Sequence, residues 1–120
     1  MQRTILIVDD EHNMQTVMRM ILEQAGHAVL TADSGEAALP QIQNPNLDVV
    51  LTDLKMPGMG GGETFDRLKE INPDVRVVLS SGYSITGRAT QIMERGCRSF
   101  IQKPFNINEI SSKIREVLDK

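Results

Sequence analysis

Strand-like and helix-like segments alternate five times along this chain, with short connections between them. The strand-like segments are apolar runs near 4–8, 28–32, 48–52, 75–79 and 98–101. A helix-like segment follows each of them, near 12–25, 35–43, 61–71, 84–95 and 106–119. Because strict alternation with short loops favours right-handed crossovers, the sequence predicts an α/β fold: a doubly wound, five-stranded parallel sheet with helices on both faces.

The composition narrows the range of functions. The 120 residues are enough for one domain, which we place at 1–120, and 13 basic and 16 acidic residues give a formal net charge of −3. Since Lys and Arg are scattered, we expect no nucleic-acid binding by this domain. The apolar runs are too short to span a bilayer and the first residues do not form a secretory leader, so we expect no membrane contact. The single cysteine, Cys97, suits a reducing cytoplasm and is expected to be a packing residue.

Several residues indicate where the helices begin, end or weaken. Gly26 is expected to close the first helix in a left-handed conformation, and Ser34 and Asn106 to cap the second and fifth helices. Pro40 lies inside the second helix, where a proline costs about 3 kcal/mol in a regular helix interior, so we expect that helix to be short, kinked or marginal. The apolar stripe of the first helix is predicted to comprise Val17, Met18, Ile21, Leu22 and Ala25.

Polar residues follow four of the predicted strands. They are Asp9 and Asp10 after 5–8, Asp53 after 49–51, Ser81 after 75–79, and Lys103 and Pro104 after 99–101. Because the carboxyl ends of parallel strands meet at one edge of the sheet, these side chains are expected to share one crevice. Like charges are costly to bury without a counter-ion, so a divalent cation and a phosphoryl group would explain this mixture of residues.

The three carboxylates suit Mg²⁺, which takes oxygen ligands in an octahedron and keeps several of its waters. Asp10 and Asp53 are the expected direct ligands, and Asp9 would act through a water. The backbone carbonyl of Lys55 would complete the protein's share of the coordination.

Asp53 is also the candidate nucleophile, because it ends the central strand and a carboxylate can carry an aspartyl phosphate. Electrostatic positioning supplies most of the catalysis in phosphoryl transfer. The metal, Lys103 and the Ser81 hydroxyl would each neutralise one of the three equatorial oxygens of the phosphoryl group.

With these motifs, the chain resembles a response-regulator receiver domain of bacterial two-component signalling. The resemblance is carried by ILIVDDE at 5–11, VVLTDLKMPGMGG at 49–61, VVLSSGY at 77–83 and SFIQKPF at 99–105, which are distributed over the full chain. It implies a flavodoxin-like sheet of order 2-1-3-4-5. Gly60 stands where the family often has Asp or Asn, which removes a cap from the third helix.

The resemblance also implies a mechanism and partners. Asp53 would accept phosphate from a phosphohistidine in the presence of Mg²⁺, and the face formed by the fourth helix, fifth strand and fifth helix would then change. The other matching positions are Asp9 and Asp10 for the metal, Ser81 for the switch hydroxyl, Lys103 for the phosphate-binding lysine and Phe100 for the aromatic switch. The expected partners are a sensor histidine kinase or histidine phosphotransfer protein, an output domain or downstream protein, and a second copy in a dimer that forms on phosphorylation.

Met14 is a candidate for contact with a partner protein at the rim of the crevice. Met14 lies one turn beyond Asp10, and we expect it at the rim where a phosphohistidine protein would dock, near Pro104 and Phe105. Packing into the core is the alternative, because methionine fills gaps readily. Separately, His12 and His27 are expected to face solvent.

Other functional interpretations remain open from the sequence. A hydrolase of the haloacid dehalogenase type also uses an aspartate nucleophile, but it needs a second Asp two residues later, where this chain has Lys55. A degenerate receiver that only binds other proteins is disfavoured, because every acidic and switch residue is present. The run Ser-Ser-Gly-Tyr-Ser at 80–84 also resembles receivers of hybrid sensor kinases, so a module cut from a hybrid histidine kinase or a multidomain regulator is a further alternative.

Overall fold

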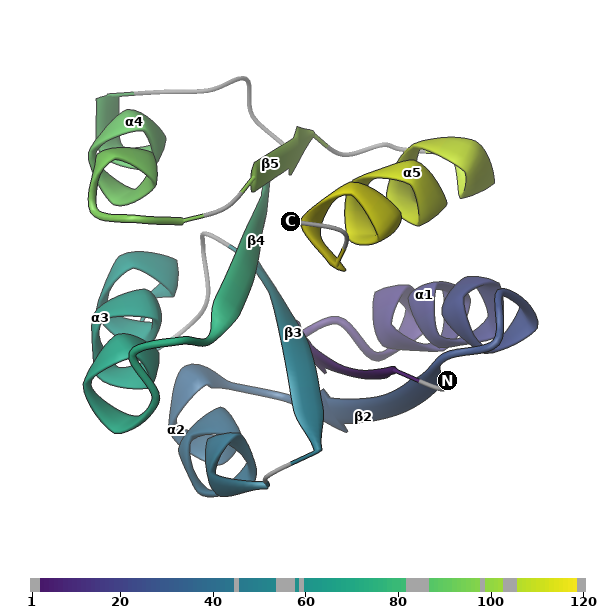
Figure 1. Ribbon diagram of the computed structural model, residues 1–120, viewed down its shortest axis with the longest axis horizontal. Helices are drawn as coiled ribbons and strands as arrows, with labels where there is room; N and C mark the ends of the chain where they lie inside the picture. Colours follow the sequence, from purple (N-terminus) through teal and green to yellow (C-terminus); the bar gives the residue numbers. More distant parts are fainter. Residues whose placement is uncertain are drawn as a thin grey trace.

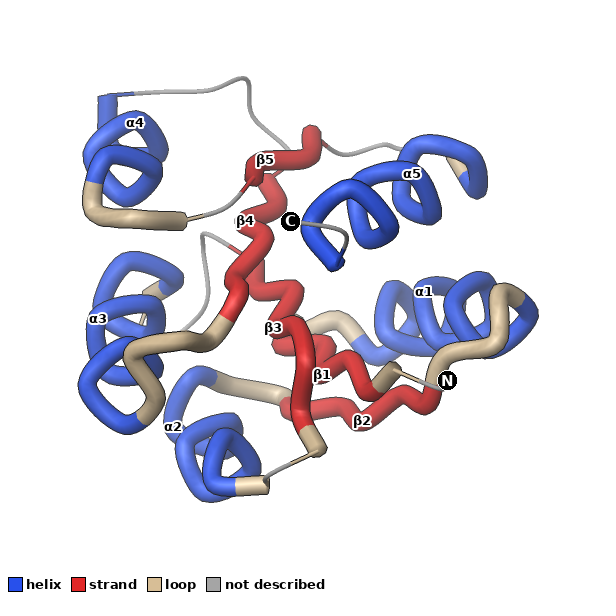
Figure 2. Tube along the Cα trace, viewed as in Figure 1, coloured by secondary structure: helices blue, strands red, loops and turns tan. Residues whose placement is uncertain are grey.

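A five-stranded parallel sheet runs through the centre of the computed structural model, with helices on both sides (Figure 1). The structure describes residues 3–44, 46–53, 58, 60–81, 87–97, 99–102 and 106–118. Helices α1 and α5 cover one face of the sheet, and α2, α3 and α4 cover the other (Figure 2). None of the helices in this part of the chain is long and apolar enough to cross a membrane.

The elements follow each other in the predicted alternation. The strands are β1 (Thr4–Val8), β2 (Ala28–Ala32), β3 (Leu47–Asp53), β4 (Arg76–Ser81) and β5 (Ser99–Gln102). The helices are α1 (His12–Gln24), α2 (Gly35–Ala38) with the 3₁₀ helix η1 (Leu39–Gln43), α3 (Gly61–Ile71), α4 (Gly87–Glu94) and α5 (Ile107–Leu118). All strand pairs are parallel and their order is β2-β1-β3-β4-β5, which confirms the predicted doubly wound, flavodoxin-like fold.

The sheet separates two apolar clusters, because successive side chains of a strand point to opposite faces. In β1, Ile5 and Ile7 pack with α1 and α5, whereas Leu6 and Val8 pack with the helices on the other face. The clusters are large: the side chains on the α1 and α5 side include Met18, Leu22, Ile110 and Ile114, and those on the other side include Ile42, Phe65, Leu68 and Ile92. Both faces are thus closed by apolar packing, which leaves the ends of the strands for polar residues.

The predicted helix caps are present. Gly26 follows α1 with φ +95°, a left-handed conformation that glycine adopts without strain. The Ser34 hydroxyl accepts a hydrogen bond from the Ala37 amide at 3.0 Å, and the Asn106 side chain accepts one from the Glu109 amide at 2.8 Å. These contacts confirm the N-caps of α2 and α5.

Pro40 has the predicted effect on the second helix. The α-helical part of this segment, α2, has only four residues, and the chain then tightens into η1 with Pro40 in the first turn. A proline lacks the amide hydrogen that the next α-helical bond would need. The second helix is therefore short, as expected.

The predicted apolar stripe of α1 was wrong at two positions. Val17 is 50% exposed and Ala25 is also exposed, whereas Gln15 is buried with Met18 and Leu22. The buried face of α1 is therefore rotated by part of a turn from the one that the apolar residues alone indicate. A polar residue can occupy such a face when its hydrogen-bonding groups have partners.

Cys97 is buried in the cluster beside α3 and α4, as predicted for a packing residue.

Candidate functional site

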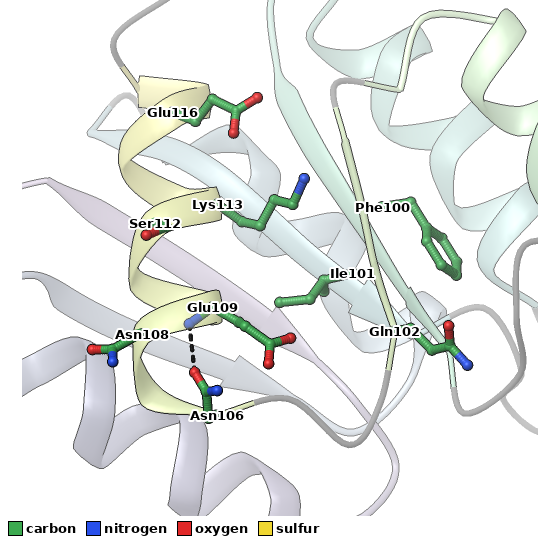
Figure 3. Close-up of a pocket in the computed structure, with 9 residues that line it drawn as sticks. All are labelled: Phe100, Ile101, Gln102, Asn106, Asn108, Glu109, Ser112, Lys113 and Glu116. Atoms are coloured by element: carbon green, nitrogen blue, oxygen red, sulfur yellow. Dashed lines mark hydrogen bonds between the residues drawn. The ribbon is translucent and has the colours of Figure 1, made fainter.

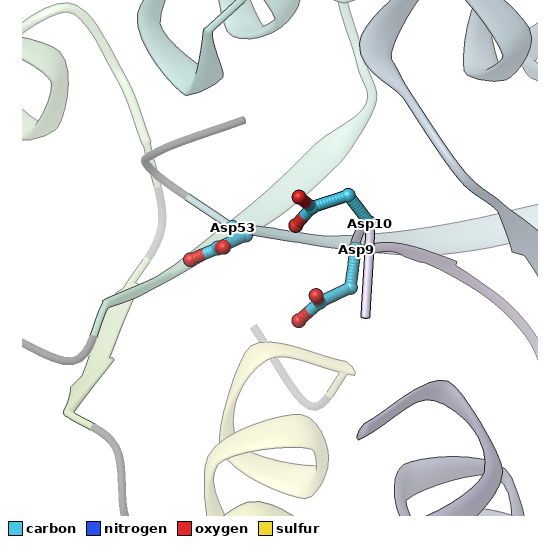
Figure 4. A group of neighbouring side chains, drawn as sticks. All are labelled: Asp9, Asp10 and Asp53. Carbon is cyan, nitrogen blue, oxygen red and sulfur yellow. The ribbon is translucent and has the colours of Figure 1, made fainter. Parts of the chain in front are cut away.

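Three carboxylates meet at the carboxyl ends of β1 and β3 (Figure 4). Asp9 and Asp10 follow β1, and Asp53 is the last residue of β3. Because Val8 of β1 pairs with Thr52 of β3, the next residue on each strand lies at the same edge. One oxygen of each carboxylate lies within 4.8 Å of one oxygen of both others. The sequence-predicted acidic residues are therefore brought together.

The three carboxylates differ in burial. Asp9 is 1% exposed, Asp53 is half-buried and Asp10 is exposed. The main-chain amide of Asp9 donates to Ala32 of β2 at 3.1 Å, and its carboxylate accepts a hydrogen bond from the amide of Glu11 at 3.0 Å. A site with buried and exposed carboxylates at one point can hold a hydrated divalent cation, whose coordination includes both protein oxygens and water.

Ser81 lies at the same edge of the sheet. It is the last residue of β4, is 2% exposed, and follows Ser80, which pairs with Asp53 in the β3–β4 register. On the next strand, β5, Phe100 is half-buried and packs against the cluster that contains α3 and α4. Ser81 and Phe100 therefore lie on neighbouring strands, and their action as a switch pair stays a prediction from the sequence.

Other predicted site residues lie outside the part of the chain that the structure describes. These are Lys55, Lys103, Pro104 and Phe105. Their roles in metal coordination, phosphate binding and partner contact remain predictions from the sequence.

Three residues of α1 and of the turn after it, His12, Met14 and His27, differ in their exposure. His12 has a 75% exposed side chain, as predicted, and its Nε2 lies 3.2 Å from a carboxylate oxygen of Asp33. A hydrogen bond from Gln15, and then one from His12, lower the pKa of Asp33 below its ordinary value. Met14 is half-buried and packs against the cluster of α1 and α5, so core contact, the alternative interpretation, applies to it. His27 is half-buried as well, which corrects the expectation that it faces solvent.

Sequence reasoning missed Gln15, whose side chain reaches the turn that carries Asp9. The available signal was a polar residue at helical spacing from Met18 and Leu22 on the inner face of α1. That spacing alone does not show which groups the amide would meet.

A groove of about 400 Å³ lies between β5 and α5 (Figure 3). Its lining includes Phe100 and Gln102 of β5 and Glu109 and Lys113 of α5. Figure 3 shows the charged ends of Glu109 and Lys113 beside the strand. The groove belongs to the face that the resemblance associates with switching.

A doubly wound parallel sheet with clustered carboxylates at the carboxyl ends of its central strands defines a class of α/β domains that can hold a divalent cation there. The model of the response regulator receiver domain family matches residues 5–115, and the chain belongs to this family. Receiver domains of two-component systems serve as phosphoacceptors, bind Mg²⁺ at an acidic pocket and interact with histidine kinases or phosphotransfer proteins.

Two known proteins are similar in sequence to nearly the whole of this chain. Sporulation initiation phosphotransferase F of Bacillus subtilis is 31% identical over 98% of this chain and 95% of its own length. The DNA-binding transcriptional regulator NtrC of Azospirillum brasilense is 30% identical over 97% of this chain but only 24% of its own length. The chain thus spans about a quarter of the length of several relatives that it matches.

A solved structure shows the same fold. The crystal structure of the CheX–CheY–BeF₃–Mg²⁺ complex from Borrelia burgdorferi superposes with a TM-score of 0.92 at 27% identity, covering 98% of this chain and 90% of that one. This TM-score shows that the strands and helices of this chain are arranged as in that structure, in agreement with its membership of the receiver domain family.

Proposed function

We propose that Asp53 accepts a phosphoryl group from a histidine of a partner protein in a reaction that needs Mg²⁺. The observation that carries this proposal is that one oxygen of each of three carboxylates lies within 4.8 Å of the others, at the carboxyl ends of β1 and β3. Asp53 is half-buried at this edge of the sheet, beside the buried Asp9 and the exposed Asp10. On this proposal the chain is a phosphoacceptor that catalyses only its own phosphorylation and dephosphorylation.

The transfer is balanced by one bond formed and one bond broken. A carboxylate oxygen of Asp53 attacks phosphorus, the bond between phosphorus and the imidazole nitrogen breaks, and that nitrogen keeps the electron pair. Mg²⁺ held by Asp9, Asp10 and Asp53 would supply positive charge for the phosphoryl oxygens. The Ser81 hydroxyl and Lys103 are proposed to bind the remaining oxygens, and the Lys55 carbonyl to complete the metal coordination.

The partner and the setting follow from family membership. We infer a sensor histidine kinase or a histidine phosphotransfer protein as donor, and a cytoplasmic location where such donors act. The solved CheX–CheY complex that contains beryllofluoride and Mg²⁺ supports a phosphoryl and metal site in a domain of this fold. Because several relatives are about four times longer, an output domain in the same protein, or a parent hybrid kinase, is the natural extension of this proposal.

Phosphorylation with acetyl phosphate tests the assignment of Asp53. With Mg²⁺ present, intact-protein mass spectrometry should show one added phosphoryl group, which is stable in acid and released by hydroxylamine. Asp53→Asn should abolish this labelling, because an amide is a poor nucleophile and lacks the negative charge that the metal needs. The matched control is Asp74→Asn, at an exposed aspartate in the turn before β4, which should label normally.

Full labelling of Asp53→Asn at another residue would contradict the proposal. Release of many equivalents of phosphate from a small phosphomonoester would instead indicate the hydrolase alternative.

A further inference from the structure

Gln15 is a buried polar side chain beside the metal-binding turn. It is 8% exposed and lies on the face of α1 that packs against the sheet. Its amide nitrogen lies 2.6 Å from the main-chain oxygen of Asp9 and 2.8 Å from a carboxylate oxygen of Asp33. The main-chain oxygen of Ala32 is a third, longer contact at 3.4 Å.

All three partners of this amide are acceptors, and this fixes its orientation. A glutamine amide has two N–H donors on nitrogen and only acceptor capacity on oxygen. The opposite orientation would place an oxygen against three oxygens. The two short contacts account for both donors, and the one to Asp33 is strengthened by the charge of the carboxylate.

The hydrogen bond from Gln15 to Asp9 holds the peptide group that precedes Asp10. The main-chain oxygen of Asp9 belongs to the peptide group that joins Asp9 to Asp10, the two acidic residues of the turn. Asp9 is already held by its amide, which donates to Ala32, and by its carboxylate, which accepts from Glu11. The hydrogen bond from Gln15 adds a third point of attachment and leaves this peptide group little freedom to rotate.

The contact with Asp33 anchors the other side of the amide. Asp33 directly follows β2, so the Gln15 side chain links the end of β2 to the turn after β1 from a position on α1. An amide held at two points is restricted in rotation, whereas an amide with one partner could still swing about it. The position of the turn is thus set by three elements of the fold.

We propose that Gln15 is a positioning residue for the divalent cation, and that its amide holds the Asp9–Asp10 peptide so that both carboxylates face Asp53. The proposal rests on the proposed function of this site. Residues that orient metal ligands without touching the metal typically change metal affinity by about 10- to 100-fold when they are removed. Gln15 does not contact the cation or the phosphoryl group in this role.

Magnesium affinity of the full chain, without a phosphodonor, tests this role. The dissociation constant is measured by titrating Mg²⁺ and following the backbone amide NMR signals of residues 9–11 and 53. Gln15→Met keeps the length of the side chain and removes both donors, so it should weaken Mg²⁺ binding by about 10-fold or more.

Two controls separate positioning from folding. Gln24→Met makes the same chemical change at the exposed end of α1 and should leave Mg²⁺ affinity unchanged. Urea unfolding of each variant reports its stability independently. A Gln15→Met domain that is less stable but binds Mg²⁺ within twofold of the wild-type affinity would show a merely structural role and overturn the proposal.

A variant at Asp33 decides the question if Gln15→Met does not fold. Asp33→Ala removes one anchor at an exposed position and should weaken Mg²⁺ binding less than Gln15→Met but in the same direction. Unchanged affinity in that variant would overturn the proposal. Failure of the wild-type chain to bind Mg²⁺ would count against the proposed function itself, which keeps the two outcomes distinct.

Discussion

Replacing Thr64 by valine should stabilise the domain. Thr64 lies in the first half of α3, is 0% exposed, and its hydroxyl has no hydrogen-bond partner within the described part of the chain. Its neighbours Phe65 and Leu68 belong to the apolar cluster between α3 and the sheet. An unsatisfied buried hydroxyl costs about 1–3 kcal/mol, because it has lost its water without gaining another partner.

The size of the effect follows from the matched shapes of the two side chains. Threonine and valine are both β-branched with similar helix propensity, so the exchange mainly replaces a hydroxyl by a methyl group. We therefore expect a gain of about 1–3 kcal/mol in the free energy of unfolding. For a urea slope of about 1.5 kcal/mol/M, a gain of about 1.5 kcal/mol moves the unfolding midpoint up by about 1 M.

Urea unfolding followed by circular dichroism measures this shift. Thr52→Val is the matched control, because Thr52 is equally buried but its hydroxyl donates to the main-chain oxygen of Asp53 at 3.3 Å. That variant should gain less than Thr64→Val or lose stability. Thr64→Ala lacks both γ-methyl groups of valine and should be less stable than Thr64→Val by about 1.5 kcal/mol. A Thr64→Val domain less stable than the wild type would refute the reasoning and point to a partner for the hydroxyl.

Two further outcomes are expected from the switch pair and from a half-buried histidine. Beryllofluoride with Mg²⁺ should shift the amide NMR signals around Ser81 and Phe100 in the wild type, and much less in Ser81→Ala. The reason is that the Ser81 hydroxyl links the phosphoryl site to the Phe100 ring. Equal shifts in the two proteins would contradict this coupling. Burial, then the charges of Arg115 and Arg3, lower the pKa of His27 below 6.5, although Asp48 partly opposes them. Since the unfolded chain binds the proton more tightly, stability should be lost as the pH falls from 6.5 through the lower folded-state pKa. An NMR titration should show this pKa rising toward 6.5 in Arg115→Gln, and a pKa at or above 6.5 in the wild type would contradict the assignment.

The fold and the acidic site could be predicted because both depend on pattern and not on fine geometry. Apolar runs that end in Asp9, Asp53 and Ser81 place these residues at strand ends, and a parallel sheet gathers strand ends at one edge. The strand order needed the family resemblance, since alternation alone fits more than one arrangement of neighbours.

Other features depended on contacts between distant segments. The burial of Gln15 was missed because a helical pattern treats a polar residue as solvent-facing, and the three acceptors that receive its hydrogen bonds come from other parts of the chain. His27 is half-buried and lines a pocket together with Arg3 and Leu118, which are distant in the sequence, so no local signal predicts its environment.

The division of the core by the sheet has a consequence for how this sequence can change over time. Neighbouring residues of one strand, such as Leu6 and Ile7, belong to different clusters and have different sets of neighbours. A substitution on one side is therefore compensated by changes on that side, and the helices opposite need not adjust. The α1–α5 side and the α2–α3–α4 side can drift separately while the strands keep their register. Two such half-independent layers allow descendants to acquire new surfaces on one side of the sheet while retaining old ones on the other.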